Sequence, residues 1–274
     1  MTQENRAVVA PPRVRIRWRD DLAGLLLTWL SPALVVTAWE LAVRSGLVRP
    51  TILPSPSIIS TTFLELLTTG ELLRHLGVSL MRVGSGFLAG ALSAVLLGTL
   101  IGLSRTAHRA SSVLLGILRP IPVVAWVPLL ILWLGIGESS KITLIAIGTF
   151  WPVLLNLVHG IRSTDHRLLE VARVLEKDQI TLLRRVIFPA AMPSLLTGIR
   201  LGMGIAWTSV IAAELLGADQ GIGFLIAYAR ELTQVDVMFT GLLTIGITGN
   251  LLDGAIRSVE RHLLRWNPHL AEGR

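Results

Sequence analysis

Six long apolar segments dominate this chain and restrict what it can fold into. They cover roughly residues 22–43, 78–103, 112–135, 141–162, 190–216 and 236–256. Each is close to the length of about 20 residues that a helix needs to cross a hydrocarbon core about 30 Å thick. Helices also satisfy their own backbone hydrogen bonds in lipid. The sequence therefore predicts an all-α, polytopic membrane protein with about six transmembrane helices.

The composition supports a membrane protein and argues against several other classes. The chain is 52% hydrophobic and only 16% charged, whereas soluble domains are about one quarter charged. Arginines that flank apolar segments explain the net charge of +7 through membrane orientation and anionic lipid, so we expect no nucleic-acid partner. The chain has no cysteine, no metal-binding histidine spacing and no phosphate-binding glycine loop. We expect no metal, cofactor or catalytic residue.

The distribution of basic residues predicts the orientation. With the N-terminus inside, seventeen basic residues fall on inner segments and five on outer ones, and inner segments of membrane proteins are the basic ones. Both termini are therefore expected in the cytoplasm. This gives a cytoplasmic arm at residues 1–21, a transmembrane domain at 22–257 with an inner loop at 163–189, and a cytoplasmic tail at 258–274. In the outer connection, we expect an amphipathic interfacial helix over Ile58–Leu76.

Small residues and prolines mark two of the apolar segments. In the second segment a small residue recurs at every fourth position: Gly86, Gly90, Ala94, Gly98 and Gly102. Such a row lets another helix approach closely, either as a moving contact or as static packing, and Gly198 and Gly202 repeat it more weakly. The third segment is interrupted by Pro120, Pro122 and Pro128 around Trp126, which predicts a kinked helix. Pro122, Trp126 and Pro128 are candidates for a translocation path, with irregular packing as the alternative.

Charged residues inside apolar segments need partners or water. Arg82 and Arg119 are expected near the membrane interfaces, where a long side chain can reach water. Arg200 lies near mid-depth, so it faces either the bundle interior or water. It is our fourth candidate for the translocation path, where it would attract anions; structural pairing is the alternative. Glu214 and Asp219 are expected at a solvated outer helix end or in contact with an external partner.

The inner loop at 163–189 predicts two short amphipathic helices. Several apolar residues share a broad face of the first helix: Leu168, Leu169, Val171, Ala172, Val174 and Leu175. Asp178 is a suitable N-cap for the second helix, and Pro189 suits the first turn of the next apolar segment. The pair either docks onto a soluble partner or lies on lipid.

This loop resembles the signature of the membrane subunits of binding-protein-dependent ABC importers, which reads E-A-A, three residues, G, nine residues, I-x-L-P. The chain keeps that spacing with Glu170-Val171-Ala172, Glu176, Val186, Phe188 and Pro189. It departs from the signature at Val171, Glu176, Val186 and Phe188. The family's glycine eases a positive φ between the two coupling helices, which Glu176 does not.

Further segments are similar to the taurine, alkanesulfonate and nitrate branch of that family. They are His75–Arg82, Leu118–Pro122, Ala125–Leu129, Leu132–Lys141, His159–Arg162 and Leu264–Pro268. Together with the loop they extend over about residues 50–268.

The resemblance implies a type I ABC importer permease fold in the bacterial inner membrane. It implies a permease homodimer, two copies of a cytoplasmic ATPase and an external solute-binding protein. ATP hydrolysis would reside on the ATPase, so this chain is not expected to be an enzyme. The solute would be a small anion of the aliphatic sulfonate, taurine or nitrate class. The implied ATPase-coupling residues are Glu170, Val171, Ala172, Glu176 and Pro189.

Three other functions remain as alternatives from the residues alone. An ion-gradient-driven secondary transporter would need mid-depth carboxylates and matched broken helices, and only Asp253, near the inner end of the last apolar segment, fits. A membrane-embedded enzyme would need a nucleophile and base pair or metal ligands within the spans. A structural anchor would leave the polar inner loop without a role.

Overall fold

The structure is a computed structural model that describes residues 18–175 and 178–265, and within these ranges all regular structure is helical. The chain divides into two compact units, residues 1–57 and residues 58–274. In the first unit, α1 (Trp18–Arg44) forms at the first predicted span. Glu40 near its end accepts hydrogen bonds from Arg44 Nε at 2.6 Å and from Ser57 Oγ at 2.8 Å. This carboxylate thereby ties the proline-rich turn to α1.

The outer connection differs from the prediction at its C-terminal end. The helix expected over Ile58–Leu76 stops early, because α2 covers only Pro56–Thr68. The chain turns at Gly70, whose φ of 77° is accessible mainly to glycine. Helix α3 (Glu71–Leu103) then begins, and the Glu71 carboxylate in its first turn suits the positive end of the helix dipole.

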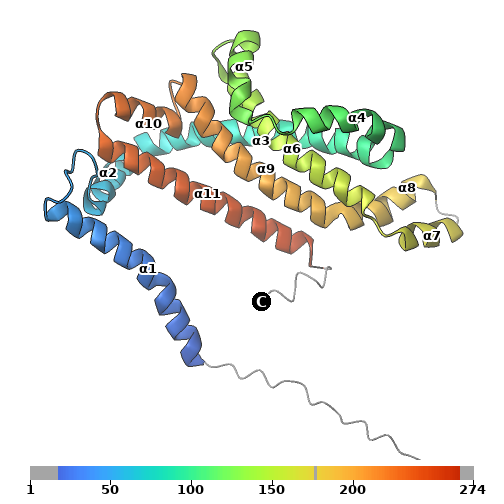
Figure 1. Ribbon diagram of the computed structural model, residues 1–274, viewed down its shortest axis with the longest axis horizontal. Coiled ribbons are helices and arrows are strands. Elements are labelled where there is room, and N and C mark those ends of the chain that lie inside the picture. Colours follow the sequence, from blue (N-terminus) through green and yellow to red (C-terminus); the bar gives the residue numbers. More distant parts are fainter. Residues whose placement is uncertain (1–17, 176–177, 266–274) are drawn as a thin grey trace, which may run out of the picture. The chain divides into compact units, whose positions relative to one another are not determined.

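Within the described residues, four helical segments are long and apolar enough to cross a membrane; Figure 1 shows how they are arranged. They are α3, α6 (Glu138–Arg162), α11 (Val235–Leu263), and a continuous stretch over Gln179–Leu215 that includes most of α9 (Phe188–Gly217). These agree with the second, fourth, fifth and sixth predicted spans.

The third predicted span is broken rather than only kinked. It consists of α4 (Arg105–Leu118), the 3₁₀ helix η1 (Val123–Trp126) and α5 (Val127–Leu134). The two parts are bent by 91°. Pro120 and Pro122 stand between them, and neither can donate the backbone hydrogen bond that would continue α4.

Helix α6 forms the centre of the second unit, with α3 and α9 packed against it (Figure 1). Its side chains Val153, Leu154 and Leu157 are fully buried. The five small residues of the row in α3 are all buried, and a Cβ added at any of the four glycines among them would meet side-chain or backbone atoms of α6. Gly198 and Gly202 of α9 contact the same helix. The close helix approach predicted from the small residues is therefore confirmed.

Short helices lie at the two ends of the long ones. At one end are α7 (His166–Val174), α8 (Gln179–Leu182) and the π-helix η2 (Leu183–Ile187). At the opposite end is α10 (Ile222–Glu231), which contacts α9 and α11 and was not predicted (Figure 1).

Candidate functional site

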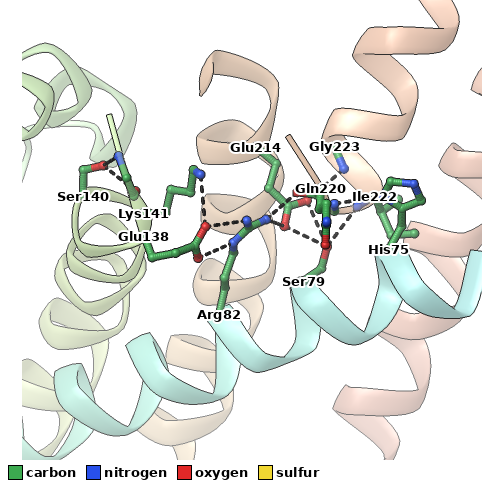
Figure 2. A network of polar contacts seen from close by, with 12 residues as sticks. His75, Ser79, Arg82, Glu138, Ser140, Lys141, Glu214, Gln220, Ile222 and Gly223 are labelled. Carbon is green, nitrogen blue, oxygen red and sulfur yellow. Dashed lines mark hydrogen bonds and ion pairs between the residues drawn. The ribbon is translucent and has the colours of Figure 1, made fainter. Parts of the chain in front are cut away.

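A buried polar network joins α3, α6 and α9 at the end of the bundle that carries α10 (Figure 2). Arg82 of α3 donates from Nη1 to Glu214 Oε1 at 2.8 Å and from Nε and Nη2 to Glu138 at 2.7 and 2.6 Å. Its Nη1 also donates to the backbone oxygen of Gln220 at 2.6 Å, while Lys141 Nζ lies 3.2 Å from Glu138. Arg82 is 3% exposed and Glu214 is 1% exposed.

Two expectations are therefore wrong. Arg82 does not reach water, because carboxylates from two other helices surround its guanidinium group within the protein. Glu214 is not at a solvated helix end, because it faces α3 and accepts a hydrogen bond from Ser79 Oγ at 2.8 Å. Asp219, three residues beyond the end of the apolar run, is exposed as expected.

The same network fixes the loop that leads into α10. Gly223 N donates to Glu214 Oε2 at 2.9 Å, Ile222 N donates to Ser79 Oγ at 2.9 Å, and Gly221 N donates to His75 Nδ1 at 3.0 Å. Gly221 has φ of 120°, and a Cβ there would collide with the Glu214 carboxylate. The buried carboxylate thus organises the start of α10 as well as the helix contact.

A signal for this network was present in the sequence. Arg82 and Glu214 are opposite charges in separate apolar segments, and each needs a partner inside the membrane. Both lie toward the ends of those segments that the distribution of basic residues predicts on the outer side. An ion pair between opposite charges on the same side of a helix bundle is therefore the first hypothesis to test.

In the inner loop, α7 presents apolar side chains to solvent. Val174 is 83% exposed, Leu168 and Val171 are about half exposed, and Glu170 is also exposed. Ala172 instead points inward and is only 7% exposed. The apolar face expected on this helix is therefore divided between an outward and an inward side. Glu176 lies outside the described residues.

The second part of the loop continues directly into α9. Asp178 caps α8 by accepting a hydrogen bond from Thr181 N at 3.2 Å, and hydrogen bonds from the Thr181 side chain and backbone lower the pKa of this carboxyl. Phe188 N donates to Leu183 O, a five-residue separation that defines the π turn. Pro189 lies in the first turn of α9, as predicted, where its missing N–H is tolerated.

Arg200 finds a partner on a different helix. A cleft of about 620 Å³ between α9 and α11 is lined in part by Arg200 and Asp253. Arg200 donates from Nε to Asp253 Oδ1 at 2.7 Å and from Nη2 to Oδ2 at 3.3 Å. Arg257 Nη2 lies 2.8 Å from the same Oδ2. The pairing expected for a mid-depth cation is present, and the side chains of all three residues are about 40% exposed.

The structure does not bring together the four candidates for the translocation path. Pro122 and Pro128 are exposed on the broken pair around η1. Trp126 lines a separate apolar groove of about 500 Å³ bounded by α3, α4 and α6, whereas Arg200 lines the cleft between α9 and α11.

Comparison with known proteins identifies relatives of this chain. Residues 86–265 match the family model of the binding-protein-dependent transport system inner membrane component. The chain is 43% identical over 256 residues to a putative aliphatic sulfonates transport permease protein, SsuC, of Bacillus subtilis (strain 168), covering 93% of this chain and 90% of that protein. It is 32% identical to the taurine transport system permease protein TauC of Escherichia coli (strain K12), covering 92% and 94%. It is 31% identical to the bicarbonate transport system permease protein CmpB of Synechococcus elongatus, covering 96% and 98%.

The fold has a counterpart among solved structures. An inward-facing conformation of the MetNI methionine ABC transporter aligns with a TM-score of 0.62 at 20% identity, covering 70% of this chain and 95% of that chain. A family model that covers most of the chain, together with full-length relatives, decides against a secondary transporter, an enzyme and a structural anchor. The chain therefore belongs to the family of inner-membrane components of binding-protein-dependent transport systems, the permease subunits of ABC importers.

Proposed function

We propose that this permease passes a small oxyanion, of the aliphatic sulfonate, taurine or nitrate class, through a homodimer. An external binding protein delivers the solute, and two copies of a cytoplasmic ATPase supply the energy. The names of the relatives support the solute class, because they refer to aliphatic sulfonates, taurine and bicarbonate. The observation that carries the proposed coupling to an ATPase is the outward apolar surface of α7, which suits a soluble protein partner.

The coupling residues have different roles in this proposal. Val171 and Val174 present apolar surface to the ATPase, with Glu170 exposed beside them. Ala172 holds α7 against the permease, since it is buried within the chain. Pro189 fixes the junction through which a push on the loop reaches α9. Glu176 is kept as a coupling residue because it occupies the position of the signature glycine.

The homodimer is supported by the charges in the cleft between α9 and α11. Arg200, Asp253 and Arg257 are partly exposed on helices that cross the membrane. Contact between such groups and hydrocarbon is costly. A second copy of the chain would enclose this face and leave a polar path between the copies. Arg200 would then line the path between the two copies.

The docking surface is tested with two aspartate substitutions on the same helix. We expect Val174→Asp to abolish co-purification of the ATPase and solute uptake while leaving the melting temperature of the permease unchanged, because this side chain packs against little of the chain. Ala172→Asp should instead lower the melting temperature, since it puts a charge into a buried position. Normal ATPase recovery with Val174→Asp would refute the proposed docking surface.

The orientation is tested by cysteine labelling, which is direct because the chain has no cysteine of its own. The proposal puts the arm at 1–21, the loop at 163–189 and the tail at 258–274 in the cytoplasm. Both Glu231→Cys at the end of α10 and Arg167→Cys in α7 place a thiol at an exposed position. In intact cells, a membrane-impermeant maleimide should label only the first variant, and both should react after lysis. The reverse pattern would show the opposite orientation.

A further inference from the structure

The cleft between α9 and α11 contains a cluster of charges that the buried network does not use. The cluster consists of Arg200 and Asp253, which line the cleft, and of Arg257, which is joined to them by its ion pair with Asp253; we call it the arginine cluster. Glu260 adds a carboxylate to the lining of the same cleft. With Glu260 included, these four side chains are formally neutral, so the cluster does not act through a large net charge.

The depth of the cluster indicates that the cleft is not filled by lipid chains. Arg200 lies about 18 Å along α9 from its start at Phe188, and Asp253 lies about 15 Å along α11 from its end at Leu263. Arg200 is therefore near the middle of a segment long enough to span the membrane, and its partner Asp253 lies toward the end of another. Charged side chains at such depth face protein, water or a polar solute. The partly exposed cluster therefore has room for a polar occupant in a cleft of about 620 Å³.

The cluster has more hydrogen-bond donors than acceptors. The Asp253 carboxylate serves both guanidinium groups, yet each guanidinium group has five N–H donors. The hydroxyl groups of Thr197 and Thr208, which also line the cleft, donate to backbone oxygens of their own helix. Arginine donors are thus the feature of this cleft that favours an anion.

We propose that the arginine cluster is a transient binding site for the oxyanion group of the solute. The inference deepens the permease function proposed above and rests on it. The oxyanion takes the planar fork of Arg200, while Asp253 keeps its contact with Arg257. Asp253 is therefore a competing internal counter-ion. Because Asp253 competes for Arg200, the site binds the oxyanion only weakly. Weak binding is what passage of a solute along a path requires.

The experiment measures direct binding to the purified permease–ATPase complex by saturation-transfer NMR, which detects weak ligands. The probe is ethanesulfonate, and the uncharged control compound is ethyl methyl sulfone. We expect ethanesulfonate to bind and the sulfone not to bind. Arg200→Gln should abolish binding. Asp253→Asn should lower the dissociation constant roughly tenfold, the effect of about one charge-assisted hydrogen bond.

The matched control is Arg119→Gln, which removes an exposed arginine outside the cleft and should leave binding unchanged. Equal binding of ethanesulfonate to the wild type and to Arg200→Gln would overturn the inference, and so would loss of binding in Arg119→Gln. If Arg200→Gln does not assemble, Asp253→Asn decides alone, because an unchanged or weaker affinity contradicts a competing counter-ion. In each of these cases co-purification of the ATPase would leave the permease function standing.

Discussion

Replacing Glu214 with alanine is expected to lower the free energy of unfolding by about 3–5 kcal/mol, the usual effect of breaking a buried ion pair from one side. The substitution leaves the Arg82 guanidinium buried without its carboxylate partner on α9. It also removes the acceptor for Ser79 Oγ and Gly223 N. We expect the melting temperature and the yield of assembled complex in detergent to fall sharply.

Two further variants separate loss of the pair from loss of a side chain. Glu138→Ala removes the other carboxylate of the same arginine, but Glu138 is 55% exposed, so water can replace it and the effect should be smaller. The double variant Arg82→Met, Glu214→Gln removes both charges, keeps an acceptor oxygen for Ser79 Oγ or Gly223 N, and should recover much of the lost stability. A double variant as unstable as Glu214→Ala would contradict an ion-pair origin.

Substitution of Gly90 is expected to separate α3 from α6. A Cβ at this position would collide with the backbone oxygen of Ala146 and come within 2.9 Å of Thr149 Cβ. The backbone atom cannot rotate away, so one helix has to shift. We expect Gly90→Ala to cost about 1–3 kcal/mol, as overpacking usually does, and Gly90→Leu to prevent recovery of folded permease. Fluorescence-detected size exclusion of the membrane extract measures this directly.

The matched control lies on the same helix. Gly84 has no heavy atom within 4 Å of an added Cβ. Gly84→Ala should be neutral or slightly stabilising, because alanine favours a helix more than glycine does. If both alanine variants behave alike, close packing is not the reason for the glycine at position 90.

The sequence predicted long helices well because a run of about 20 apolar residues has few other solutions in lipid. It missed α10, because the ten residues of Ile222–Glu231 are too few for a span and lie within an outer connection. It located the interruption near Pro120 and Pro122 but not the 91° bend. Prolines show where a helix stops, whereas the direction that the chain takes afterwards depends on tertiary packing.

Some features of the functional residues could likewise be predicted from the sequence, whereas others depended on tertiary packing. Arg82 and Glu214 are 132 residues apart in the chain, so their ion pair depends on how α3 and α9 pack and not on any local pattern. The apolar face of α7 could be predicted from its spacing. The sequence could not predict which side of that face the rest of the permease covers. Ala172 lies on the covered side. Arg200 was expected to need a partner, but Asp253 was identified only by the fold.

The uninterrupted helical stretch over Gln179–Leu215 has a mechanical consequence. Its 37 residues reach from the loop at 163–189 to the buried network around Arg82 and Glu214, a distance of about 55 Å. Gly198 and Gly202 press it against α6 between these ends. If the stretch tilts about this contact, the arm to Leu183 measures about 26 Å and the arm to Glu214 about 21 Å. The two arms of this lever are of similar length, so an ATPase that pushes the end at Leu183 one way would move the end at Glu214 almost as far in the opposite direction.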